Sequence, residues 1–138
     1  MNINFSYDAT KGVSSCIIVD KDKTFIGLAL CHPDDMDFMS EKTGCNIAES
    51  KARIEMLKYK RDELKATIKT FKHFMSCIKN SKNYNPNSYE TKMIRRQLRQ
   101  LENQLATTKQ EIATEKEALK EYIVLKDNFY KKIRKART

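Results

Sequence analysis

The sequence predicts an α+β protein, in which a small N-terminal antiparallel β-sheet packs on a long antiparallel two-helix hairpin, a coiled-coil-like stalk. Short runs rich in Val, Ile and Phe lie before residue 32, and apolar residues at helical spacing fill the remainder. The chain has only 3 Gly and 2 Pro in 138 residues, so its regular elements should be long. We therefore expect a β head over residues 1–45, which ends in a short turn and the entry to a helix at 40–44. A helical hairpin should follow over residues 46–138, with its turn near 81–88 and its C-terminal end packed back on the head.

Three strands are expected in the head. Residues 12–19 and 24–31 are apolar runs separated by the charged turn 20–23, which predicts a β-hairpin. A weaker strand is expected over residues 2–7, where apolar and polar residues alternate. Residues 32–35 include a proline and should end the last strand, because proline lacks the backbone donor that a ladder requires.

Two long helices should follow the head. Residues 46 to about 80 contain no Gly or Pro, and their apolar residues recur at steps of three, four and seven, the pattern of a coiled-coil seam. Pro86 breaks the helix within the turn 81–88, and Ser88 can cap a second helix that keeps a similar frame. A short linker between two such helices predicts antiparallel pairing. The seam residues of the first helix are Ile47, Ile54, Leu57, Leu64, Ile68, Phe71, Met75 and Ile78, and those of the second are Ile94, Leu98, Leu101, Leu105, Ile112, Leu119, Tyr122, Phe129 and Ile133.

Several residues depart from this seam. Arg61 is a charged seam residue, and we favour a stem lying along the seam with the guanidinium in water over a functional role. Thr108, Glu115 and Lys126 weaken the second seam.

The residues expected to pack on the sheet are Tyr122, Ile123, Phe129, Tyr130 and Ile133. The apolar residues off the seam, expected to form a second seam between subunits of a homo-oligomer, include Met56, Tyr59, Phe74, Met93 and Ala106.

The sequence does not resemble that of an enzyme. It has no Gly-rich phosphate loop, no HExxH and no catalytic pair of carboxylates. Its four cysteines form no CxxC pair, and the first ten residues carry no basic head followed by an apolar segment, so we expect core thiols in a reducing cytoplasm. No metal site or cofactor is expected, and the apolar runs are too short for a membrane span.

The net charge of +9 is unevenly spread. One basic cluster surrounds Pro86, and another occupies the C-terminal residues 131–137. Guanidinium forks bind phosphates and aromatic rings stack on bases, and charge localised at helix ends suits a compact phosphorylated ligand better than a duplex. A solvated basic face explains the turn cluster equally well. The candidate ligand-binding residues are Tyr84, Tyr89, Lys92, Arg95, Arg96 and Arg99.

Four segments carry a resemblance to a known family: FIGLALCHPDD at 25–35, SEKTG at 40–44, IAESKA at 47–52 and SYETKMIRRQ at 88–97. Together with the two long helices, they make the chain similar to the phage Thoeris anti-defence proteins of the first described type. The resemblance implies a non-enzymatic sponge that binds glycocyclic ADP-ribose, the signal of a defensive TIR-domain enzyme, in the host bacterial cytoplasm. It also implies hexamers with ligand pockets between subunits, and cyclic trinucleotides bound by some members at separate sites.

Two other functions remain open at this point. A nucleic-acid-binding module would use its basic ends to clamp a backbone and would show a steep salt dependence, although the acidic residues between those ends make it the weaker hypothesis. A helical-hairpin inhibitor or scaffold for a host protein would need only a groove on its partner. The candidate ligand-binding residues depend on side-chain chemistry alone, because the resemblance carries no ligand contact over to numbered positions.

Overall fold

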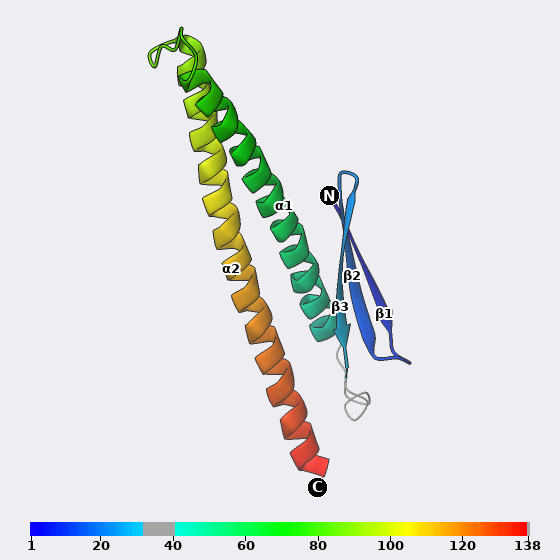
Figure 1. Cartoon of the computed structure of the whole chain (residues 1–138). Helices are drawn as coiled ribbons and strands as arrows, with labels where there is room; N and C mark the ends of the chain where they lie inside the picture. The colour runs from blue at the N-terminus through cyan, green and yellow to red at the C-terminus, as the bar shows by residue number, and fades with distance from the viewer. Residues whose placement is uncertain (32–40, 138) are drawn as a thin grey trace. The chain divides into compact units, whose positions relative to one another are not determined.

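A computed structural model describes residues 1–31 and 41–137 of the chain. Its elements are β1 (Asn2–Asp8), β2 (Val13–Asp20), β3 (Lys23–Leu30), α1 (Glu41–Lys79) and α2 (Tyr89–Arg137) (Figure 1). The α+β fold class is confirmed, and so are the three strands and two long helices. The turn expected at 32–35 lies outside the described residues. Neither helix contains a stretch apolar and long enough to span a membrane.

The chain divides into two compact units. The first, which we call the sheet unit, comprises Met1–Met56 and Ile112–Thr138; the second, the hairpin unit, is Leu57–Glu111. Both helices therefore contribute residues to both units.

The sheet is antiparallel in the order β1-β2-β3 (Figure 1). Asp20 pairs with Lys23, so the turn of the hairpin is the two residues Lys21 and Asp22 rather than the four expected. Lys21 has a φ of 57°, in the left-handed region that only short loops commonly use. The strands extend to the turn because a two-residue loop with this backbone matches the twist of the paired strands.

The inner face of the sheet packs on α1. Cys16 and Ile18 of β2 are fully buried there. A Cβ on Gly27 would overlap the carbonyl oxygen of Ala48 and lie 2.6 Å from the backbone nitrogen of Ala52, so only glycine permits this approach of β3 to the helix. The buried core cluster consists of Cys16, Ile18, Ala29, Ile47, Ala48, Ala52 and Met56, with Ile3, Phe25, Leu119 and Ile123 packed against it.

Helix α1 begins at Glu41, five residues earlier than expected. Gly44, which was expected in the entry to the helix, lies inside it. A Cβ at Gly44 would collide with the side chain of Ser14 on β2, so the glycine accommodates a close contact with the sheet. The helix tolerates the weaker propensity of glycine at this point because packing against the sheet stabilises its first turns.

The outer face of β2 and β3 is also apolar. Ile26, Leu28 and Leu30 of β3 are 56%, 50% and 67% exposed, and the register places Ile17 beside Ile26 on the same face. The described residues leave these three side chains of β3 largely open to solvent.

The residues at the end of α2 that were expected to pack on the sheet differ in burial. Ile123 packs against the core cluster and Tyr130 is buried, whereas Tyr122 and Phe129 are 36% and 51% exposed. Met56 was also misplaced: it lies in the core and is not available to a seam between subunits. Ala48, Ala52 and Met56 are four apart and form a second buried stripe of α1, which a single seam does not describe. The side chain of Ile133 is half-buried.

The hairpin unit is an antiparallel helix pair with a narrow apolar seam. Ile68 and Met75 of α1 are buried, whereas the seam leucines of α2 are only half-buried. Lys72 lies 3.7 Å from Glu102 across the pair. Arg61 is half-buried, and its Nε contacts the Asp62 carboxylate at 3.1 Å.

Candidate functional site

The linker between the helices is held by local hydrogen bonds. Helix α1 ends at Lys79 and α2 begins at Tyr89. The Asn85 side-chain oxygen accepts a bond from the Asn87 amide at 2.9 Å, and the Ser88 amide donates to the Asn85 carbonyl at 3.1 Å. Ser88 Oγ accepts the Thr91 amide at 3.2 Å and donates to Thr91 Oγ1 at 2.7 Å. The predicted cap at Ser88 is therefore confirmed, and it fixes where α2 starts.

Arg95 joins the first turns of α2 to this linker. Its Nη2 donates a hydrogen bond to the Tyr84 hydroxyl at 2.9 Å, and its Nη1 donates to the Pro86 carbonyl at 3.5 Å. The structure thus brings together Tyr84 and Arg95, two of the residues that the sequence singled out. Part of the guanidinium's donor capacity is used in positioning the linker, so Arg95 is less available to a ligand than its exposure suggests.

Four basic residues of α2, Lys92, Arg95, Arg96 and Arg99, form what we call the basic arc. Their spacings of three and four residues place them on one side of the helix, within an angle of roughly 100°. All four are exposed, whereas the adjacent Thr91 is buried. Among the described residues, the side chains of Lys92, Arg96 and Arg99 make no hydrogen bond or ion pair, so their charges are open to solvent or a ligand.

Tyr89 stands apart from this arrangement. It is the first residue of α2 and is 73% exposed. Within the described ranges, its ring and hydroxyl have no partner. Within the described part of the chain, the six candidate residues therefore comprise a bonded pair (Tyr84 and Arg95), three cations without partners, and a solvated ring.

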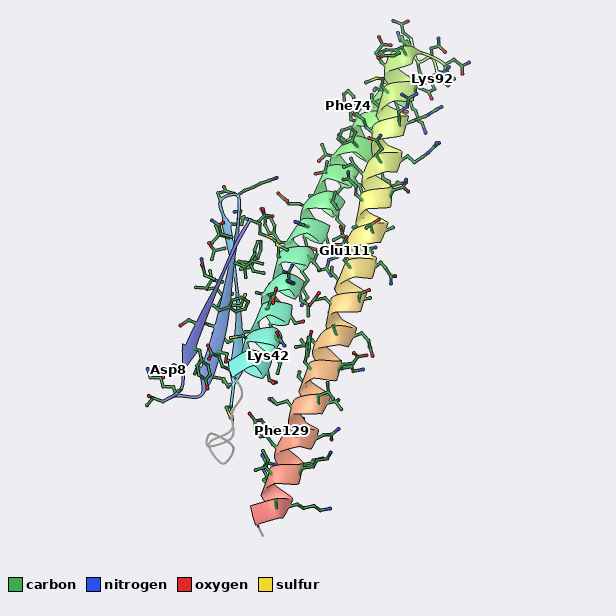
Figure 2. The ribbon with its side chains drawn as sticks, turned by 180° about the vertical axis from the view of Figure 1, so that it is seen from behind. Asp8, Lys42, Phe74, Lys92, Glu111 and Phe129 are labelled. Atoms are coloured by element: carbon green, nitrogen blue, oxygen red, sulfur yellow. The ribbon has the colours of Figure 1, made fainter. Side chains whose placement is uncertain are left out.

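The hairpin unit carries almost all of the net charge. It has 13 basic and 5 acidic residues, a net charge of +8, whereas the sheet unit has 14 and 13, a net charge of +1. The C-terminal basic run therefore lies in a unit whose charges nearly balance. In Figure 2, Lys92 lies at the linker end of the helix pair and Glu111 lies farther along α2. A large excess positive charge raises the local concentration of anions.

A groove in the hairpin unit was missed by the sequence reasoning. Its volume is about 610 Å³, within the range of small-molecule sites. The sequence signal was Thr108, a polar residue at a seam position, where a leucine would have filled part of the space. The lining residues are Lys60, Glu63, Leu64 and Thr67 of α1 and Asn103, Gln104, Thr107, Thr108 and Glu111 of α2.

The threonines of the groove present acceptor oxygens. Thr67, Thr107 and Thr108 each donate a hydroxyl hydrogen bond to the carbonyl four residues earlier, at 2.9 to 3.1 Å. Their lone pairs stay available, because the donor is already used. The side-chain amides of Asn103 and Gln104 have no hydrogen bond to other described residues, so each offers both a donor and an acceptor.

The cysteines differ in environment. Burial raises the pKa of the Cys16 thiol, with a smaller contribution from Glu49, and burial also raises the pKa of Cys45. The core assignment is right for Cys16 and wrong for Cys77, which is exposed, with its Sγ 3.7 Å from His73 Nε2. Cys77 and His73 lie four residues apart on α1 and thus on one face, a pairing that the sequence analysis overlooked.

Residues 1–31 and 41–137 contain no group of three or more side chains able to hold a metal ion.

Comparison of the chain with protein-family models, with curated proteins and with solved structures found no match. The chemistry of the hairpin unit, together with the sequence resemblance, is what indicates a function. That chemistry has two parts, the basic arc and the groove.

Proposed function

We propose that this protein binds a phosphorylated nucleotide without altering it, and that glycocyclic ADP-ribose is the signal that it sequesters. In this proposal a phage uses it to block Thoeris defence in the host bacterial cytoplasm. The observation that carries the proposal is the exposed basic arc beside the Tyr84–Arg95 hydrogen bond of 2.9 Å. Paired guanidinium groups suit the two phosphates of such a ligand, and an exposed tyrosine ring suits its base.

Sequestration demands affinity rather than chemistry. The site must hold the signal tightly enough to compete with the effector, and it needs neither a nucleophile nor a cofactor. The +8 charge of the hairpin unit supports this role, because it attracts a dianionic ligand and speeds its encounter with the arc. Cyclic trinucleotides carry the same phosphate chemistry and are candidates for a second class of ligand.

We also propose that the protein is a homo-oligomer, with the hexamer that the resemblance implies as the working hypothesis. The apolar outer face of β3, with Ile26, Leu28 and Leu30 at least half exposed, supports association, since contiguous exposed apolar side chains mark protein interfaces. Light scattering at micromolar concentration should give a mass that is a multiple of the chain, and Leu28→Lys should lower it. A monomeric wild type would contradict this part of the proposal.

Ligand retention tests the main proposal. The purified protein is incubated with glycocyclic ADP-ribose, free ligand is removed by filtration, and the retained protein is heated and its released nucleotide identified by mass spectrometry. Intact ligand should return. A chemically altered nucleotide would make the protein an enzyme, and no retained nucleotide would contradict the proposal and favour the nucleic-acid or host-protein alternatives.

A pair of matched variants tests the basic arc. Arg96→Ala with Arg99→Ala should weaken binding at least tenfold, since each removes a charged donor worth about 1.5 to 3 kcal/mol. The control is Lys65→Ala with Lys69→Ala, which removes the same charge from exposed positions of the hairpin unit outside the arc. An equal loss in both variants would indicate a general electrostatic effect, and no loss in either would remove the arc from the site.

A further inference from the structure

One edge of the groove, at Asn103 and Thr107, continues the side of α2 that carries the basic arc. Arg96 and Asn103 are seven residues apart, which is close to two full turns, and Arg99, Asn103 and Thr107 are successive members of an i, i+4 row. At about 1.5 Å per residue, Asn103 lies roughly 6 Å beyond Arg99 and roughly 10 Å beyond Arg96 along the helix. The groove therefore opens one turn past the arc, within the reach of one extended small molecule.

The two features differ in charge. The arc has four cations, whereas the groove contains the carboxylates of Glu63 and Glu111 and one lysine, Lys60. Two carboxylates in a groove repel phosphate, so an anionic group is directed to the arc. An uncharged ring with several hydrogen-bonding groups has the opposite preference, because the carboxylates accept bonds from its N–H and O–H groups.

The groove lining suits such a ring. The side-chain amides of Asn103 and Gln104 carry a donor and an acceptor each, and an amide of this kind can pair in bidentate fashion with an adenine edge. Leu64 supplies an apolar surface from α1. No aromatic residue is among the described residues that line the groove, so recognition here is by hydrogen bonding to ring edges and hydroxyls rather than by stacking.

We propose that the groove is the ring-binding half of a nucleotide site whose phosphate-binding half is the basic arc. The inference rests on the proposed function and assigns its ligand an orientation: phosphates at Arg96 and Arg99, and base or ribose between Leu64 and the amides of Asn103 and Gln104. Discrimination among nucleotides then comes from the groove, while the arc binds any compact phosphate.

The test compares two probes, ADP-ribose and inorganic pyrophosphate, by isothermal titration calorimetry on the full chain. Wild type should bind ADP-ribose more tightly than pyrophosphate. Asn103→Ala with Gln104→Ala should weaken ADP-ribose about tenfold and leave pyrophosphate unchanged, because only the ring loses partners. Arg96→Ala with Arg99→Ala should weaken both probes.

A control variant separates the groove from the helix surface. Gln97→Ala with Gln110→Ala removes two exposed amides of α2 that do not line the groove, and it should bind both probes as wild type does. All of these substitutions place alanine at exposed helix positions, where it is the best helix former, so folding should persist and circular dichroism will verify it.

The outcomes separate the two proposals. Unchanged ADP-ribose binding in the groove variant, with loss in the arc variant, overturns the groove assignment and leaves the proposed function in place. Equal affinity of wild type for ADP-ribose and pyrophosphate also overturns the groove assignment, since it leaves only an anion surface. Failure of wild type to bind ADP-ribose or glycocyclic ADP-ribose overturns both proposals.

Discussion

The sheet unit and the hairpin unit distribute packing and charge in opposite ways. The sheet unit has the buried core cluster and a net charge of +1, whereas the hairpin unit has a narrow seam and a net charge of +8. Burial of apolar side chains stabilises a fold, and accumulated like charge opposes it. One chain thus concentrates its stability in one unit and its capacity to attract anions in the other.

The difference also appears in how each unit treats polar residues. In the sheet unit, buried Ser50 donates a hydrogen bond to Glu115 at 2.5 Å, so a weak seam position is satisfied by a specific partner. In the hairpin unit, the Thr108 hydroxyl donates its hydrogen bond to Gln104 of the same helix, and a groove opens beside it. A polar residue at a seam position therefore makes a hydrogen bond between the helices in the sheet unit, whereas in the hairpin unit it lines an open groove.

The largest expected effect tests the core of the sheet unit. Gly27→Ala should lower the free energy of unfolding by about 3 kcal/mol or more, because its Cβ meets helix backbone that cannot rotate away. Urea denaturation measures it. Gly44→Ala is the matched control: its Cβ meets the Ser14 side chain, which can move, and alanine gains helix propensity, so the change should stay within about 1 kcal/mol. Equal losses would show that the close approach at Gly27 does not specify the fold.

A smaller loss of stability is expected from a change at the start of α2, which lies in the hairpin unit. Ser88→Ala removes the bond to the Thr91 amide and should lower stability by about 1 kcal/mol. Hydrogen exchange should place the loss of protection in the hairpin unit and leave residues 13–30 unchanged. Ser88→Asp, which keeps an acceptor at the cap, should restore protection, and protection lost across the sheet as well would contradict local action.

Salt should affect the two units differently. Four like-charge pairs at spacings of three or four occur in the basic arc, each unfavourable by about 0.2 to 0.5 kcal/mol at low ionic strength. Raising salt should therefore increase protection from hydrogen exchange in the hairpin unit by up to about 1 kcal/mol, with little change in the sheet. Arg96→Gln should reduce this response. Equal stabilisation of both units would point to a general salt effect rather than to relief of repulsion.

The smallest effect concerns the buried thiol of the sheet unit. Because burial raises the pKa of Cys16 above its ordinary value of 9.0, the folded protein keeps a proton that the unfolded chain loses. This contribution is present below about pH 9 and is lost as the pH rises through the higher pKa of the folded state, so stability should fall as the pH is raised above about 9. Cys16→Ala should show a smaller fall in urea denaturation, and Cys77→Ala, at an exposed position, should match wild type. An identical fall in all three would exclude the thiol as the cause.

The fold could be predicted from the sequence because its signals are local. Alternating residues identified β1, the charged turn separated β2 from β3, and Pro86 with Ser88 defined the linker. The burial of Met56 and the exposure of Phe129 were not predicted, because they depend on which helix face the tertiary structure buries. A helix of 39 residues can present one face to its partner helix and another to a sheet, and a single periodicity identifies only one of these faces.

Only part of the candidate site could be predicted from the sequence. The basic arc follows from spacing alone, since residues three and four apart share a helix side. The bond from Arg95 to Tyr84 spans the linker, whose path depends on the hydrogen bonds of Asn85 and Ser88. The groove requires the separation between two helices, a distance that no one-dimensional pattern encodes, although Thr108 marked its position.

Lys51 protects one edge of the sheet against pairing with further strands. Its Nζ donates a hydrogen bond at 2.8 Å to the carbonyl of Leu28, on an edge strand of the sheet. An open strand edge recruits further strands and seeds fibrils, and a lysine on that edge is a common protection. The ammonium occupies an acceptor that an incoming strand would need, while the apolar side chains of β3 stay exposed. The proposed association of copies through that face is thereby separated from uncontrolled β-aggregation through the edge.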